Sequence, residues 1–173
     1  IYAKLRADGV VTGEEGGQQG WGGFGYGEAT IFNFQQVQTD EISVRWSGFN
    51  VFTNFTLTPG SYGNFGSVFG DLFEGIFIAN NVLVNVQDNS SISEGVRDRI
   101  VGEALFGRAL YYSTALSLFG NLPKITIPQT DPLNLPKQVD PSEIAELVIE
   151  DFTLAAELLP ASYSEEEYGR FTK

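Results

Sequence analysis

The residue types that most enzymes use for chemistry are scarce in this chain. Its 173 residues include no cysteine, histidine or methionine. Thiolate catalysis, a Ser-His-Asp triad, an HExxH zinc site and haem ligation by histidine are therefore excluded within the chain. Acidic residues dominate, with 22 Asp and Glu against 10 Lys and Arg. This balance disfavours nucleic acid or an anionic membrane surface as a partner, because phosphates are bound by Lys and Arg, and it is compatible with neutral ligands or cations.

Adjacent carboxylates occur at Asp40-Glu41, at Glu14-Glu15 and at residues 165–167. Glycoside hydrolysis needs two carboxylates across a sugar, about 5–9.5 Å apart. Because acidic residues are so abundant here, neighbouring pairs do not by themselves indicate such a site. The oxygen-ligand spacing of a D-x-D-x-D-G calcium loop is absent from the sequence. We therefore predict no catalytic residue, no metal and no cofactor.

One glycine pattern formally matches a nucleotide-binding fingerprint. Gly20, Gly22 and Gly25 have the G-x-G-x-x-G spacing. That pattern binds pyrophosphate only between a buried strand and the start of a helix. Here it follows the polar residues 13–19 within a glycine-dense stretch, residues 9–27. We interpret the stretch as a loop and the match as coincidence.

Aromatic residues in loops are better candidates for a binding site. A flat ring can stack on the apolar CH face of a sugar while Asn or Arg side chains bind the hydroxyls, and exposed aromatics on loops favour binding. In the alternative interpretation, Trp46 and Phe52 pack at the base of the loop layer. The candidate ligand-binding residues are Trp46, Asn50, Arg45, Trp21 and Tyr62.

A second polar group lies on the longest apolar pattern of the chain. Arg108, Tyr111 and Tyr112 are adjacent on what we expect to be a buried helix. At such positions an arginine is predicted to pair with a carboxylate, here Glu103 or Asp151, and the tyrosines to pack with their hydroxyls satisfied. We therefore interpret these residues as structural.

The elements that position these residues are mainly helices, because apolar residues recur at helical spacing. The expected helices are residues 1–8, 28–38, 68–87, 92–119 and 141–159. Residues 9–27, 42–67 and 121–139 are predicted to be loops, with an extended segment at 51–58 and a surface connection at 121–139. The predicted fold class is all-α, a layer of packed helices with long irregular loops inserted.

Local signals mark where the two best-defined helices begin and end. Ser91 and Glu94 have the spacing of a capping box before the central helix. Gly120 and Pro123 form a stop after it. Residues 140–143, Asp-Pro-Ser-Glu, combine a cap, proline at the first helical position and glutamate at the third.

The sequence around the central helix resembles the SusD/RagB family of surface lipoproteins of Bacteroidota. Residues 102–112, Gly-Glu-Ala-Leu-Phe-Gly-Arg-Ala-Leu-Tyr-Tyr, resemble the family's G-E-A-x-F-L-R-A-x-x-Y run. Residues 119–123, Phe-Gly-Asn-Leu-Pro, resemble its F-G-x-x-P stop. The order and spacing of all the matching elements make the resemblance specific. The further matching segments are residues 39–41, 74–81, 140–160 and 169–173.

The resemblance implies tetratricopeptide-like helix pairs and a surface glycan-binding function. Such a protein would hold an oligosaccharide at the extracellular face of the outer membrane for a TonB-dependent transporter of the SusC type, with no chemistry of its own. Some relatives bind peptides, and a carbohydrate-active enzyme is a further alternative. We expect residues 1–173 to be the N-terminal part of one such domain, excerpted from a longer protein whose lipid anchor lies outside this chain.

Overall fold

The computed structural model describes most of the chain from residue 50 onward. The described residues are Tyr2, Gln36, Thr39, Glu41, 50–56, Thr58, 62–128, Leu133 and 135–173. The predicted helices at 1–8 and 28–38 lie outside these residues, apart from Tyr2 and Gln36, which are both helical. The glycine-rich stretch at 9–27 also lies outside them. The chain forms two compact units, Tyr2–Asp71 and Leu72–Lys173, which are described separately.

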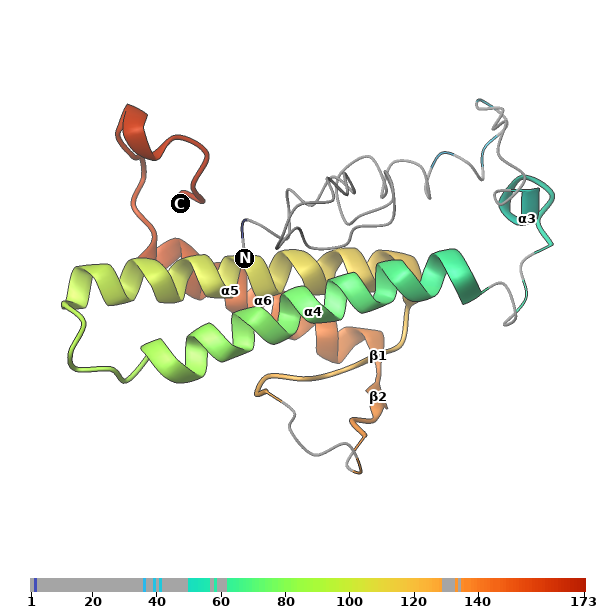
Figure 1. Cartoon of the computed structure of the whole chain (residues 1–173), viewed down its shortest axis with the longest axis horizontal. Coiled ribbons are helices and arrows are strands. Elements are labelled where there is room, and N and C mark those ends of the chain that lie inside the picture. The colour runs from blue at the N-terminus through green and yellow to red at the C-terminus, as the bar shows by residue number, and fades with distance from the viewer. Residues whose placement is uncertain are drawn as a thin grey trace, which may run out of the picture. The chain divides into compact units, whose positions relative to one another are not determined.

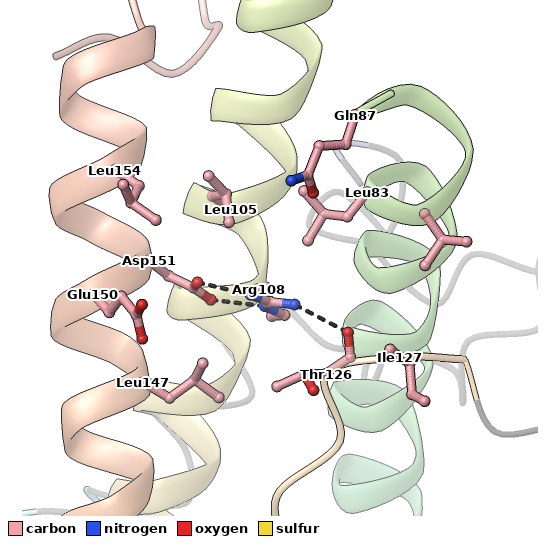
Figure 2. A pocket seen from close by; sticks show the side chains of 11 residues that line it. Leu83, Gln87, Leu105, Arg108, Thr126, Ile127, Leu147, Glu150, Asp151 and Leu154 are labelled. Atoms are coloured by element: carbon pink, nitrogen blue, oxygen red, sulfur yellow. Dashed lines mark hydrogen bonds and ion pairs between the residues drawn. The ribbon is translucent and has the colours of Figure 1, made fainter. Parts of the chain in front are cut away.

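Three helices build the second unit. They are α4 (Tyr62–Val86), which enters the unit at Leu72, α5 (Glu94–Phe119) and α6 (Pro141–Leu158). Figure 1 shows a short connection from α4 to α5 and a long one from α5 to α6, and Figure 2 shows α5 between the other two helices. Small and aliphatic side chains fill the space where the helices meet, because their apolar stripes face one another. One buried cluster comprises Leu83, Val101, Ala104, Leu105, Ala155 and Leu159.

Helix α4 is longer than its sequence predicts. The apolar pattern suggested a start at residue 68, whereas the helix begins at Tyr62. The added turns contain Gly63 and Gly66, and each glycine disfavours a helix by about 1 kcal/mol relative to alanine. Propensity is a weak guide where a long helix already continues, so the prediction of a loop up to residue 67 is wrong at this end.

The start of α5 also differs from the sequence prediction. The helix begins at Glu94 with Ser93 as its N-cap residue, and the Ser93 side chain makes no capping hydrogen bond. The prediction of a capping box at Ser91 is therefore wrong. The backbone N–H of Ser91 instead donates to the Asn89 side-chain oxygen at 3.0 Å, a local turn that competes with helix capping. The predicted end is confirmed, since Gly120 has φ +70° and its N–H donates to the Leu116 carbonyl.

Helix α6 follows its sequence signals closely. Asp140 is the N-cap residue, and its side chain accepts a hydrogen bond from the Ser142 N–H at 2.9 Å. Bonds from the Ser142 hydroxyl and N–H hold the pKa of Asp140 below its usual value. Pro141 occupies the first turn, where its missing N–H costs nothing. The predicted helix at 141–159 is therefore confirmed to within one residue of its end.

The connection between α5 and α6 is more ordered than a surface loop. Its ends pair as a two-stranded antiparallel ladder, β1 (Leu122–Pro123) with β2 (Gln138–Val139). Leu122 has no exposed surface. The prediction of a surface connection is therefore wrong at Leu122, because an apolar residue next to a helix stop can join the core, whereas Gln138 at the other end is exposed as predicted. None of the described helices is both long and apolar enough to cross a membrane.

Candidate functional site

Arg108 lies at the centre of a buried polar network between the three helices. Its Nε and Nη2 donate to the two Asp151 carboxylate oxygens, each at 2.7 Å. Its Nη1 donates to the Asn80 side-chain oxygen at 2.9 Å. Arg108 is 7% exposed and Asp151 2%. Since a buried charge is tolerated only when it is paired and hydrogen-bonded, this two-bond arrangement is what allows both ions inside the core.

The same network holds the segment after β1 against the helices. Asn80 Nδ2 donates to the Ile125 carbonyl at 2.9 Å, and Arg108 Nη1 contacts the Thr126 carbonyl at 3.3 Å. The Tyr112 hydroxyl accepts from the Ile125 N–H at 2.7 Å and lies 3.2 Å from the Pro123 carbonyl. These side chains therefore satisfy backbone groups that have no regular secondary structure, as buried backbone groups require.

Replacing Tyr112 with phenylalanine is expected to lower the free energy of unfolding by about 1–3 kcal/mol, because it leaves the Ile125 N–H without its partner. Burial raises the pKa of Tyr112 from 10.0 to about 12. Because the pKa of Tyr112 is higher in the folded protein than in the unfolded chain, its neutral hydroxyl contributes to the free energy of unfolding below pH 10.0. This contribution is lost as the pH rises toward about 12. Urea unfolding across this range should therefore show the difference between wild type and variant shrinking. An equal difference at every pH would contradict the assignment.

Glu103 binds the C-terminal segment rather than Arg108. Arg170 donates from Nε to Glu103 Oε1 at 2.8 Å and from Nη2 to Oε2 at 3.0 Å. The Arg170 guanidinium carbon also lies 5.7 Å from the centre of the Tyr163 ring. Of the two partners that the sequence allowed for Arg108, the structure selects Asp151. The structural interpretation of Arg108 and Tyr112 is thus confirmed by their partners.

A pocket opens beside the Arg108–Asp151 pair. Its volume is about 360 Å³, and mainly aliphatic side chains form its walls. In Figure 2, Asp151 on α6 faces Arg108 on α5, and Thr126 lies on the other side of the guanidinium. Because Asp151 is bound to Arg108, the pocket presents a neutralised ion pair. The lining residues are Leu83, Val84, Gln87, Leu105, Arg108, Thr126, Ile127, Leu147, Glu150, Asp151 and Leu154.

Most of the predicted ligand-binding residues lie outside the described part of the chain. This holds for Trp21, Arg45 and Trp46, and for the side chain of Tyr62, whose backbone begins α4. Asn50 is described and exposed, as the first residue of α3 (Asn50–Thr53). Its carboxamide has no hydrogen-bond partner among the described residues. These side chains remain predicted as ligand contacts.

The segment around α3 is not extended as the alternation of its residues suggested. Phe52 is only 1% exposed, so the packing interpretation of this residue is confirmed. The helix ends in a Schellman motif, in which the Phe55 N–H donates to the Phe52 carbonyl at 3.1 Å and the Thr56 N–H to the Val51 carbonyl at 2.9 Å. Over residues 51–56, local hydrogen bonds thus replace the extended segment that the sequence predicted.

Phe55 occupies the position of the Schellman motif that glycine usually fills. Its φ is +52°. For a residue with a side chain, the left-handed conformation costs about 1–2 kcal/mol. Burial does not offset this cost, because Phe55 is 75% exposed. A strained residue that gains little from packing is a candidate for function, and the sequence analysis did not single it out because no sequence signal marks a phenylalanine with positive φ.

Comparison with known proteins places the chain in a family. The family model described as starch-binding and associating with the outer membrane matches residues 28–173. A SusD-like protein of Formosa agariphila is 35% identical over 104 residues, which are 60% of this chain and 20% of that protein. The chain thus spans about a fifth of the length of this curated relative.

Solved structures agree with this comparison. A laminarin-binding SusD-like protein superposes with a TM-score of 0.66 at 34% identity, covering 72% of this chain and 27% of that one. A SusD-like carbohydrate-binding protein from Bacteroides fragilis superposes with a TM-score of 0.64 at 26% identity, covering 71% and 25%.

The paired helices and the polar network between them define an all-α scaffold of the tetratricopeptide type. The family model covers most of the chain, and the chain therefore belongs to the SusD-like family.

Proposed function

We propose that the protein binds an oligosaccharide at the outer face of the outer membrane and passes it to a TonB-dependent transporter of the SusC type. The observation that carries the proposal is the similarity, at 34% identity, to a laminarin-binding SusD-like protein. The match to a family described as starch-binding and outer-membrane-associated supports both the ligand class and the location.

The chemistry of the chain supports a glycan ligand over an anionic polymer. The net charge is −12. A polyanion would have to overcome this charge, whereas a neutral sugar needs amides, hydroxyls and aromatic rings. The predicted contacts at Trp21, Trp46, Asn50 and Tyr62 supply these groups, and Arg45 adds a donor for sugar hydroxyls.

Isothermal titration calorimetry of the full-length protein against laminarin, starch and other soluble glycans tests the proposal. We expect saturable binding to at least one glycan of the panel, with no release of reducing ends. Failure to bind any of them would contradict it. Mass spectrometry of co-purified ligands tests the alternative, because a peptide-binding relative would retain oligopeptides. Release of reducing ends from a bound glycan would indicate an enzyme instead.

The transporter partner and the location have their own test. Affinity purification of the tagged protein from outer membranes should recover a TonB-dependent transporter, and protease added to intact cells should digest the protein. Recovery without any transporter would contradict the import function while leaving glycan binding in place.

A further inference from the structure

We propose that the open pocket beside Arg108 and Asp151 docks an amphipathic helix of a partner protein, with aliphatic side chains on one face of that helix and lysine or arginine beside them. The inference goes beyond glycan binding and does not depend on it. It rests on the aliphatic rim of the pocket, on the spacing of residues along α6, and on the sign of the charges on the helices that flank the pocket.

The rim of the pocket exposes aliphatic side chains from three elements. Val84 of α4 is 59% exposed, Ile127 of the segment after β1 is 60% exposed and Leu154 of α6 is 41% exposed, and all three line the pocket. Figure 2 shows Leu154 and Ile127 on opposite sides of Arg108. Single exposed apolar residues are normal on a protein surface, whereas several around one hollow indicate a contact site.

The outer edge of α6 has the repeat of a helix-packing seam. Leu147 and Leu154 both line the pocket and are seven residues apart. Glu143, Glu150 and Glu157 are exposed and have the same spacing. Seven residues make about two turns of an α-helix, so the leucines form one row and the glutamates a second row beside it. A partner helix laid along α6 would meet both rows again in every heptad, over about 21 Å.

The charges around the pocket favour a cationic partner. Neither α4 nor α6 contains a lysine or arginine. Arg108 is neutralised by Asp151, and Lys124, in the segment that leads to Ile127, is not among the lining residues. Glu150 lines the pocket and forms no salt bridge within the described part of the chain.

This row of glutamates determines which helix fits. In coiled coils, charged residues that flank the apolar seam set the choice of partner, because opposite charges pair across it. Lysine or arginine on the docked helix would therefore pair with Glu143, Glu150 and Glu157. A second copy of the same surface would bring glutamate against glutamate, and like charges suppress such an association.

Two synthetic helical peptides test the proposal. Each is about three heptads long with leucine at the a and d positions, and one carries lysine and the other glutamate at the e and g positions. Fluorescence anisotropy with the full-length protein should show saturable binding of the lysine peptide and at least tenfold weaker binding of the glutamate peptide. Absence of binding by the lysine peptide, or equal binding of both, overturns the proposal.

Variants of α6 locate the binding site. The triple variant Glu143→Gln, Glu150→Gln and Glu157→Gln should weaken binding of the lysine peptide at least tenfold. Leu154→Ala should weaken it about threefold to tenfold, because it removes part of the apolar contact. Wild-type affinity in the triple variant would show that the peptide binds elsewhere and overturns the proposal.

A matched control is needed because the net charge of −12 attracts any cationic peptide. The triple variant Glu94→Gln, Glu165→Gln and Glu166→Gln removes the same charge from exposed positions that do not line the pocket. It should bind the lysine peptide with wild-type affinity. An equal loss in both triple variants would make the attraction non-specific and overturn the proposal.

Other occupants of the pocket give different results. This chain contains no cysteine, so Val84→Cys places a single thiol of the chain at the rim. Maleimide should label this thiol readily in the full-length protein, and the lysine peptide should protect it. Resistance to labelling before peptide is added would show that another part of the protein covers the pocket. A dimer in sedimentation that the lysine peptide dissociates would show a second copy there.

Either of these results overturns the assignment to a partner helix. The proposed function is tested separately, because the triple variant Glu143→Gln, Glu150→Gln and Glu157→Gln should bind glycan as wild type does. A failure of the docking site therefore leaves glycan binding in place, and a failure of glycan binding leaves the docking site in place.

Discussion

Replacing Arg108 with alanine is expected to lower the free energy of unfolding by about 3–5 kcal/mol, the cost of breaking a buried ion pair by removing one partner. The variant leaves the Asp151 carboxylate, 2% exposed, without its cation. It also removes the donor to Asn80 and the contact to the Thr126 carbonyl. Urea unfolding of the full-length protein measures the loss. Hydrogen exchange should in addition become faster at residues 123–127, which the network holds in place.

Two comparisons keep this prediction specific. Arg97→Ala removes an arginine that lies 3.8 Å from Asp98 and is partly exposed, and a surface pair of this kind contributes about 0–1 kcal/mol. The double variant Arg108→Met with Asp151→Leu should be more stable than either single variant, because it leaves no buried charge unpaired. A loss below about 1 kcal/mol in Arg108→Ala would show that water reaches Asp151 and that the network does not stabilise the core.

The parts of the fold that the sequence predicts are those with local causes. The start of α6 follows from the Asp140 side chain capping its own helix, and the end of α5 follows from Gly120. The pairing of Arg108 with a carboxylate was predictable because a buried arginine requires one. Which carboxylate pairs with Arg108 was not predictable. Glu103 and Asp151 lie on different elements, and the choice between them depends on where α6 and the C-terminal segment pack.

The remaining features depend on long-range packing or on strain. Glu103 meets Arg170, which is 67 positions away in the chain. The positive φ of Phe55 has no sequence signal, because its hydrogen bonds exist only once the turn has formed. The alternating pattern of residues 51–58 predicted a strand, yet a strand needs a neighbour with which to pair. Among the described residues, β1 and β2 are the strands that find one.

The polar side chains of the buried network lie in the segments that carry the family resemblance. Asn80, Arg108 and Asp151 come from three separate matching segments and contact one another directly. Glu103 and Arg170 join two segments in the same way. The resemblance therefore identifies the scaffold, because the motif residues hold the helices together, and it gives little information on the ligand. The predicted ligand contacts, Trp21 and the residues between 45 and 62, lie outside the network.

Replacing Gly75 with alanine is expected to destabilise the protein by about 1–3 kcal/mol, the usual cost of overpacking a core. A Cβ atom at this position of α4 would lie 2.6 Å from two ring carbons of Tyr111 on α5. That distance is well inside van der Waals contact, and Tyr111 has no exposed surface into which it can retreat. The clash therefore outweighs the gain of up to about 1 kcal/mol that alanine normally brings to a helix.

The matched control lies five residues earlier in the same helix. A Cβ atom at Gly70 would meet nothing within 4 Å. Gly70→Ala should therefore raise stability by up to about 1 kcal/mol through helix propensity alone. Both variants can be compared by thermal and urea unfolding. Equal stability of the two would contradict the close packing of α4 on Tyr111. The cause can be confirmed in the Tyr111→Leu background, where the smaller side chain should make Gly75→Ala less destabilising than it is in wild type.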